Sequence, residues 1–433
     1  MAVNDPNQTT ISSIKLTQTA VSSDVELAVS ALRAKASAYS TFWKYYDGDH
    51  PQVYTNKRLA EIFRNIDVAF SENWSAVVVD ALDDRVNLQS VHVKGIRAQK
   101  HMSALWDNLV LSNESDAVHL AAMVCGESFL IVWPDAENQP TAYFNDPRLC
   151  HVFYDERNPH RARMAAKWWY DTTRMRLMLY YPDKLEYYHA SKNGRVVDFD
   201  TKWIYEETAV NPHGIVPVFR FVATQRGKSD LKDAIPIQIG INKLANDMMV
   251  AAEFGAFKQR WVISQAETLD ALKNAPNEIW EIPAGDGAGQ STQVGEFQGT
   301  DLLAYIRGID HFAAALAAIT RTPKHYFFKT SSNISGEALL TMEAPLVRKA
   351  QKRISSFSPE WRRVFQFLLK LDGVNVKLSD ITPIYEPTSS LQPLTMAKIR
   401  ETNTKAGVPL ATQLRREGWS DDEITAMNAD KGV

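Results

Sequence analysis

The chain has 433 residues, of which 45% are hydrophobic and 23% charged, a composition typical of globular proteins long enough to form several modules. Its formal net charge of −3 argues against a protein that coats nucleic acid through a surplus of lysine and arginine. Cys125 and Cys150 lie far apart and outside any Cys/His metal spacing, which indicates a reducing site of synthesis and no disulfide.

The N-terminal quarter of the chain is expected to be a loose tail followed by helices. Residues 1–25 are polar and carry no secretory signal. Apolar spacing then predicts helices from about residue 25 to residue 125, the first ending at Gly48 and Pro51 and the last at Gly126. No apolar run approaches the roughly 20 residues that span a bilayer, so no membrane anchor is expected.

From Ser128 to about Val222 the pattern changes to short runs rich in β-branched and aromatic residues, separated by turn residues. These runs predict a mostly antiparallel sheet packed against helices, and therefore an α+β fold. The predicted strands are "SFLIVW", "PTAYF", "CHVFYD", "AAKWWYD", "RMRLMLYY", "KLEYYHA" and "IVPVFRF".

Two long helices are predicted around a compact insert. The segment 235–257 is apolar on more than one face and should be covered on two sides, and 300–321 begins with Thr300 as the expected N-cap and Asp301 in its first turn. The insert 258–299 contains the strand-like runs "RWVIS" and "EIWEIP" and a glycine-rich turn. Acidic residues outnumber basic ones in it: Glu267, Asp270, Glu278, Glu281, Asp286 and Glu296 against Lys258, Arg260 and Lys273.

The second of these helices is followed by an unusual connector, residues 322–335. It combines aromatic, basic and small polar side chains, namely Lys324, His325, Tyr326, Phe327, Phe328, Lys329, Thr330, Ser331, Ser332 and Asn333. A third helix should start at Ser335 or Gly336 and kink at Pro345. "SPEW", with Ser358 as N-cap, predicts a separate helix to about Leu371, and short helices should complete the C-terminus.

Known catalytic and ligand-binding motifs are absent from the sequence. "RGKSD" (226–230) ends like a phosphate-binding loop, but the position that requires the first glycine is Val222. "GDGAG" (285–289) lacks dinucleotide-binding spacing, and neither HExxH nor GxSxG occurs. We therefore expect neither an enzyme nor a cofactor.

A basic run lies on the helix that follows the connector. It comprises Arg348, Lys349, Lys352 and Arg353. Two interpretations remain open: a solvated helix face, or a contact with phosphates or with an acidic neighbouring subunit.

Several segments, taken together and in order, resemble the portal proteins of long-tailed, siphophage-type double-stranded DNA bacteriophages. They run from about Phe42 to about Arg363, so the resemblance covers most of the chain. The segments are "YYDGDHP", "NWSAVVVDALDDRV", "CGESFLIVWPD", "NPHGIVPVFRF", "AIPIQIGINKLANDMMVAAEFGAFKQRWV" and "SGEALLTMEAPLVRKAQKR".

The resemblance implies a portal-type fold with a mixed helix/sheet wing, a two-helix stem, a small α/β clip, a long kinked helix and a helical crown. The expected divisions are 1–25 tail, 26–234 wing, 235–257 stem, 258–299 clip, 300–321 stem, 322–335 tunnel loop, 336–387 kinked helix and wing completion, and 388–433 crown. The acidic residues of the insert would then belong to the partner-docking clip.

The function implied by the resemblance is that of a dodecameric ring at one capsid vertex, through which double-stranded DNA is packaged and later ejected. Implied partners are the terminase large subunit, the head-completion adaptor and the major capsid and scaffolding proteins, without a membrane. The location would be the virion, after assembly in the host bacterial cytoplasm. The alternative is another capsid-associated structural or adaptor protein without a DNA channel.

Within this interpretation the connector would be the loop that projects into the channel. A bore lined with many lysines would hold DNA tightly, so Lys324 and Lys329 suit transient phosphate contacts. We expect Lys329 and the polar tip Thr330–Asn333 to face DNA. Tyr326–Phe328 would either anchor the loop against the channel wall or form a local cluster that closes the preceding helix.

Overall fold

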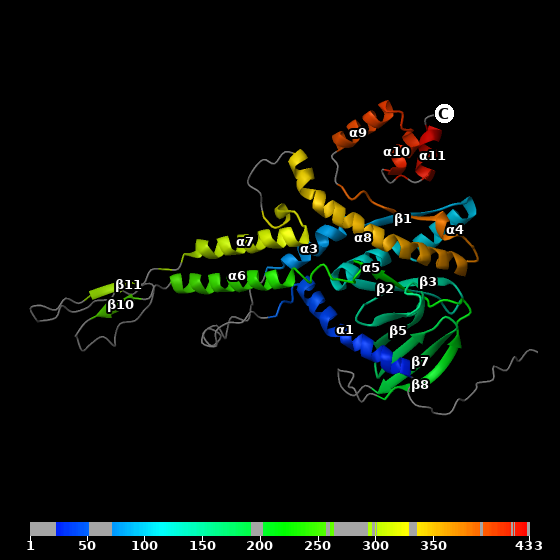
Figure 1. Ribbon diagram of the computed structural model, residues 1–433, viewed down its shortest axis with the longest axis horizontal. Coiled ribbons are helices and arrows are strands. Elements are labelled where there is room, and N and C mark those ends of the chain that lie inside the picture. Colours follow the sequence, from blue (N-terminus) through cyan, green and yellow to red (C-terminus); the bar gives the residue numbers. More distant parts are fainter. Residues whose placement is uncertain are drawn as a thin grey trace, which may run out of the picture. The chain divides into compact units, whose positions relative to one another are not determined.

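The computed structural model describes a mixed helix and sheet protein (Figure 1). The residues described are 23–51, 72–191, 202–256, 260–263, 293–296, 299, 301–328, 336–389, 393–416, 419 and 421–430. They divide into two compact units. The sheet unit comprises Met1–Ser37 and Arg148–Val218, and the helical unit comprises Ala38–Pro147 and Phe219–Val433.

The sheet unit is built on one antiparallel five-stranded sheet. Its strands, in spatial order, are β4 (Cys150–Tyr154), β5 (Ala162–Tyr170), β6 (Arg174–Tyr180), β7 (Lys184–Ser191) and β8 (Ile204–Val210). The first turns of α1 (Ser23–Asp47) cover it, because Val25, Ala28 and Leu32 are buried in one cluster with Trp168 and Leu177. The strands predicted between residues 150 and 190 are confirmed.

The prediction misses β8, the edge strand of this sheet. Its side chains are mostly exposed, and Glu206 and Glu207 interrupt the alternation of polar and apolar residues that marks a half-buried strand. It is held by pairing with β7, for example between Leu185 and Ala209. Strand pairing therefore supplies what the local sequence pattern lacks.

The helical unit combines long helices with two small sheets. Before the stem region its elements are α3 (Trp74–Asp83), β1 (Leu88–Val93), α4 (Ile96–Asn108), α5 (Leu111–Cys125), β2 (Glu127–Pro134), β3 (Pro140–Asn145) and β9 (Val218–Val222). The strands form the sheets β3-β2-β9 and β1-β12, the latter completed by β12 (Ile381–Tyr385). β1 corrects the expectation of helices alone between about residues 25 and 125; it was missed because its partner strand is remote in sequence.

Helix α8 (Gly336–Leu371) forms the centre of the main core. It contains both Pro345 and Pro359, so the prediction of a separate helix starting at Ser358 is wrong. The Ser358 hydroxyl donates to the Ile354 carbonyl at 2.7 Å, as a residue inside a helix does, instead of capping a helix N-terminus. Figure 1 shows the yellow first turns of α8 at an angle to its orange remainder.

Burial on both sides of Pro359 explains why α8 continues. A proline inside a helix costs about 3 kcal/mol or more. Phe357, Trp361 and Phe365 are fully buried in one cluster, and burial of each such side chain stabilises the fold by roughly 1.5–3 kcal/mol. Packing of the apolar face therefore outweighs the local signal for a helix start.

The other helices mostly follow the expected pattern. Val110, with φ 49°, separates α4 from α5 where one region was predicted, and Gly126 ends α5 as expected. The C-terminal elements are the short η3 (Leu378–Asp380) and the helices α9 (Pro393–Lys405), α10 (Leu410–Arg416) and α11 (Asp421–Asp430). The C-terminal series of helices is therefore confirmed.

His119 of α5 is buried against α8 in its neutral form. The Trp361 indole nitrogen can only donate, so His119 Nε2 accepts its hydrogen bond at 2.9 Å and Nδ1 donates to the Val86 carbonyl at 3.0 Å. The His119 ring also stacks on Phe357 with 4.8 Å between centroids. Burial lowers the pKa of His119 to about 3.

This histidine should make the fold sensitive to acid. The unfolded chain binds a proton near pH 6.5 and the folded chain does not, so the stabilisation is complete above pH 6.5. It should be lost at about 1.4 kcal/mol per pH unit as the pH falls towards the folded pKa. Urea unfolding at several pH values would check this. H119Q should flatten the pH dependence, whereas H160Q, at an exposed turn, should leave it unchanged.

Candidate functional site

The two helices expected as a stem lie side by side as α6 (Ile235–Ala256) and α7 (Leu302–Thr320) (Figure 1). Glycines allow them to approach closely. A Cβ atom on Gly308 would lie 2.9 Å from Leu244 Cδ1, and one on Gly240 would lie 3.4 Å from Phe312 Cζ. The N-cap of α7 is Asp301, whose carboxylate accepts from the Leu303 amide, so the expected first-turn role of Asp301 is corrected.

This helix pair exposes several large apolar side chains. Five large apolar side chains along α6 and α7 are 44% to 57% exposed: Ile239, Met249, Leu303, Ile306 and Ile319. Ile306 and Ile319 are exposed, whereas Leu316 of the same helix is buried. Large exposed apolar surface on a folded chain marks an interaction site.

Among the described residues, one helix, α7, has the length and apolar composition that a membrane-spanning helix needs. Only 17% of its most apolar 18-residue stretch is buried within the chain. Its buried Leu316 packs in one cluster with Ile241 of α6, so the same apolar composition also suits a helix packed between neighbouring proteins.

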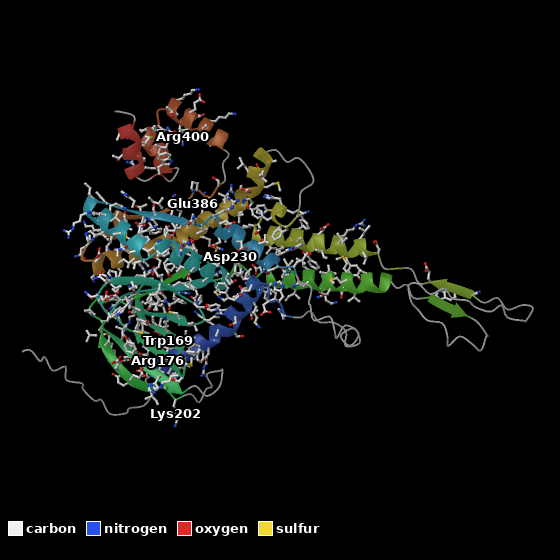
Figure 2. The ribbon with its side chains drawn as sticks, turned by 180° about the vertical axis from the view of Figure 1, so that it is seen from behind. Trp169, Arg176, Lys202, Asp230, Glu386 and Arg400 are labelled. Atoms are coloured by element: carbon white, nitrogen blue, oxygen red, sulfur yellow. The ribbon has the colours of Figure 1, made fainter. Side chains whose placement is uncertain are left out.

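A buried ion cluster fastens both helices of the pair to α8. Asp230 lies just before α6 and is labelled in Figure 2. Lys349 Nζ contacts its carboxylate at 2.9 Å and Arg353 Nη2 contacts it at 2.6 Å. Lys349 Nζ also donates to the carbonyl of Thr320, the last residue of α7, at 3.1 Å. We call Asp230, Lys349 and Arg353 the stem clamp.

The stem clamp corrects part of the basic-face prediction. Lys349 and Arg353 are buried and paired within the chain, whereas Arg348 and Lys352 are exposed. Only Arg348 and Lys352 therefore remain candidates for an external contact. The spacing from Leu346 through Lys349 and Arg353 to Phe357 places the clamp cations on the buried face of α8, and this periodicity could have revealed them.

The segment 226–230, which resembles a phosphate loop in sequence, is packed against the end of α5. The Ser229 hydroxyl donates to the Val124 carbonyl at 2.5 Å, and the Asp230 amide donates to the Met123 carbonyl at 2.9 Å. Gly126 has φ +94°, and a Cβ atom there would lie 2.1 Å from the Gly227 carbonyl oxygen. These contacts give the segment a structural role.

Gln238 ties α6 to the start of α3. Its side-chain oxygen accepts from the amides of Trp74 and Ser75 at 3.0 and 3.1 Å, so it caps the helix N-terminus. Its nitrogen donates to the Glu72 carbonyl and, at 2.9 Å, to Asn242. Sequence reasoning missed this residue, because a glutamine within an amphipathic helix carries no sign of burial.

The first part of the expected tunnel loop lies in a charged and aromatic cluster. After α7 the chain forms the short η2 (Lys324–Tyr326). The Tyr326 hydroxyl accepts from Arg85 Nη2 at 3.0 Å, and the same nitrogen lies 3.1 Å from the carboxylate of Glu343 in α8. His325 Nε2 lies 3.6 Å from Glu343. Glu343 of α8 and Arg85, which follows α3, therefore hold η2 in place.

The two phenylalanines after η2 both contact Trp74 of α3. Each ring centroid lies 5.8 Å from that of Trp74, and Phe327 also packs against a cluster containing Leu316 of α7. Lys324 Nζ lies 5.3 Å from the centroid of Phe328. Phe327 and Phe328 thus pack with Trp74 close to the end of α7.

The remaining predicted site residues lie largely outside the described residues. These are Lys329, Thr330, Ser331, Ser332 and Asn333 of the loop, and Glu267, Asp270, Glu278, Glu281 and Asp286 of the insert. Glu296 is exposed at the end of β11 (Gln293–Glu296), which pairs with β10 (Arg260–Ile263). β10 falls on the predicted run "RWVIS", whereas "EIWEIP" is outside the described residues and β11 was not predicted.

Comparison with protein families identifies the chain. A family model described as "Phage portal protein, SPP1 Gp6-like" matches residues 31–430. The chain belongs to this portal protein family. This family match confirms the resemblance inferred from the sequence. No curated protein gives a significant match.

Phage portal proteins are structural components of the virion capsid that take part in DNA packaging. In this portal protein, no group of three or more His, Cys, Asp or Glu side chains among the described residues is placed to hold a metal ion. The contacts that organise the site are the stem clamp, the Gln238 cap and the anchored start of the loop.

Proposed function

We propose that the chain forms a dodecameric ring at one capsid vertex, the channel through which double-stranded DNA is packaged and ejected. The terminase large subunit docks on the clip, 258–299, during packaging, and the head-completion adaptor replaces it afterwards. The wing contacts the major capsid and scaffolding proteins. Assembly takes place in the host bacterial cytoplasm.

The observation that supports this proposal is the exposed apolar surface of α6 and α7. A ring forms when one face of a subunit binds a different face of the next and the rotation closes. A helix pair with apolar side chains on both members offers faces for both neighbours. The alternative, a capsid-associated adaptor without a channel, does not require apolar residues along the whole pair.

Electron microscopy of the purified protein tests the ring. We expect negatively stained particles with a central hole, and no ATP hydrolysis by the pure protein. I306E should reduce the fraction of rings several-fold, because it places a charge in an apolar contact, and should leave the circular dichroism spectrum unchanged. I204E, at a similarly exposed position of β8, is the matched control. Monomers of the unaltered protein would contradict the proposal.

The loop residues Lys324 and Lys329 are proposed to contact phosphates transiently. The double variant K324A/K329A should lower the amount of DNA packaged per head, because it removes two phosphate contacts from each subunit. The decrease should be several-fold at most, since the charge removed per subunit is small. Quantifying encapsidated DNA checks this. K405A, at an exposed lysine paired with Glu401, controls for a general loss of charge. Unchanged packaging and genome retention would remove the proposed contact.

A further inference from the structure

An open hollow of about 810 Å³ lies between the start of α4 and the turn that follows α8. Its walls are fixed by several contacts. The Lys94 amide donates to the Asp380 carbonyl at 2.8 Å, and His101 Nδ1 lies 2.6 Å from the Asp372 carboxylate. The paired strands β1 and β12 end beside it, with Val93 opposite Ile381. The hollow is therefore a built feature of the helical unit.

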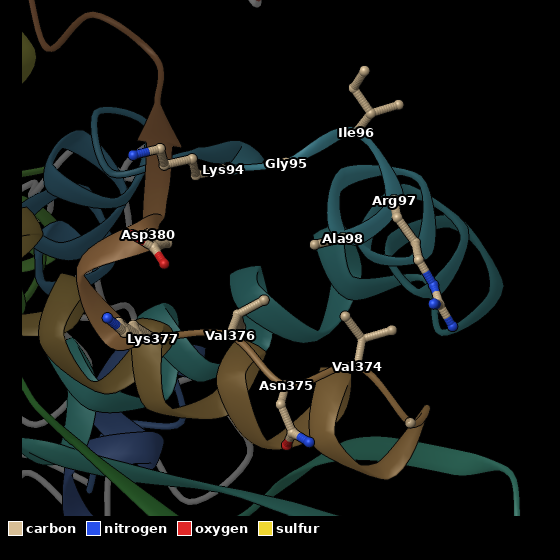
Figure 3. A pocket seen from close by; sticks show the side chains of 11 residues that line it. Lys94, Gly95, Ile96, Arg97, Ala98, Val374, Asn375, Val376, Lys377 and Asp380 are labelled. Carbon is tan, nitrogen blue, oxygen red and sulfur yellow. The ribbon is translucent and has the colours of Figure 1, made fainter.

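The lining combines apolar and cationic side chains. Ala98 and Val374 are buried at its base, Val376 is partly buried, and Ile96 is 94% exposed at its rim. Figure 3 shows Val374 and Val376 on the side formed by the turn after α8, and Ile96 projecting away from the ribbon. An isoleucine exposed to this degree offers an apolar contact that no described part of the chain covers.

Positive charge surrounds this apolar base. Lys94 and Lys377 lie on one side of the hollow with Asp380, and Arg97 lies at the opposite side (Figure 3). All three cations are exposed, and none forms an ion pair with another described residue. The local balance is +2, from three cations and one carboxylate, although the whole chain carries −3. The N-terminus of α4, where Gly95 offers no side chain to cap it, adds partial positive charge at the same place.

We propose that this hollow docks an acidic peptide segment of a partner protein, with one apolar side chain of that segment seated on Val374 and Val376 and a second one against Ile96 at the rim. Carboxylates of the segment pair with Lys94, Lys377 and Arg97. The inference goes beyond the proposed function and does not depend on ring formation.

Two features favour a peptide over duplex DNA. A DNA site is normally a basic stripe that neutralises many phosphates. This hollow has only three cations, and the carboxylate of Asp380 lies among them. The apolar base would contribute nothing to phosphate binding, but it matches the side chain of a peptide anchor.

The test uses the full chain and a fluorescently labelled probe, a short peptide in which glutamates flank a Leu-Phe pair. Fluorescence anisotropy at low ionic strength should show saturable binding. K94E/K377E should weaken binding at least about tenfold, equivalent to about 1.4 kcal/mol. D380N should strengthen it, because it removes a repulsive carboxylate. I96A should weaken it without a change of charge.

Matched controls separate docking from general electrostatics. R157E/K202E reverses the charge of two exposed cations of the sheet unit and should leave peptide binding unchanged. A probe with lysines in place of glutamates should not bind. Equal binding by the K94E/K377E variant, or no response to both I96A and D380N, would overturn the proposal. So would duplex DNA that binds this site more tightly than the peptide. Because I96A and D380N alter exposed or partly exposed groups, they keep the test decisive if the double variant does not fold.

Discussion

D230A should lower the free energy of unfolding by about 3–5 kcal/mol, because it leaves Lys349 and Arg353 buried without their counter-ion. Burial by itself raises the pKa of Asp230, but the two cations outweigh this and hold its pKa below the ordinary value. The carboxylate is therefore ionised whenever the protein is folded at neutral pH. Chemical denaturation followed by circular dichroism would measure the loss.

The stabilisation by the stem clamp should depend on pH, because it requires an ionised Asp230. Because the folded pKa is depressed, the stabilisation is present above the unfolded pKa of about 3.9 and is lost as the pH falls below it. D233A is the matched control, since Asp233 lies three residues further on and pairs with Lys228 at the surface. It should change stability by less than about 1 kcal/mol. Equal effects of D230A and D233A would show that the stem clamp is not energetically important.

G126A should destabilise the helical unit by at least about 3 kcal/mol. Gly126 has φ +94°, where an L-residue is strained, and its Cβ would lie 2.1 Å from the Gly227 carbonyl and 2.9 Å from the Ser229 amide nitrogen. Both neighbours are backbone atoms, so the loop that carries Asp230 must move. A lower melting temperature and a lower yield of soluble protein are the expected readouts.

G373A separates strain from steric overlap. Gly373 has φ +78°, but a Cβ atom added there would have no other atom within 4 Å. Its substitution should therefore cost only about 1–2 kcal/mol, the strain of the left-handed conformation. If G126A and G373A were equally destabilising, the close packing of Gly227 against Gly126 would have no energetic importance.

Local sequence patterns predicted most elements because their signals are local. The apolar and aromatic runs of β5 and β6, the glycine stop after Cys125 and the apolar composition of α6 all act within a few residues. β1 and β12 were missed because each is stabilised by the other across most of the chain. α8 was divided wrongly at Ser358 because its burial, which overrides the proline, is a property of the assembled core.

The candidate site was predicted in outline but not in detail. The order of paired helices, insert and connector was readable, since it is carried by composition and length. The stem clamp was not, because Asp230 and the cations of α8 are brought together only by folding. A basic run on a helix is usually a solvated face, and in this chain half of the run turns inward.

The continuity of α8 has a mechanical consequence. Pro345 and Pro359 each lack the amide that would complete a helical hydrogen bond, so each is a compliant point in an otherwise stiff rod. Lys349 and Arg353 lie between the two prolines, in the part of α8 that the stem clamp attaches to α6 and α7. Phe357 and Trp361 are buried on either side of Pro359, whereas Pro345 lies between Glu343 and the stem clamp, so we expect α8 to bend most easily at Pro345. A displacement of the loop end would then be taken up before it reaches the core.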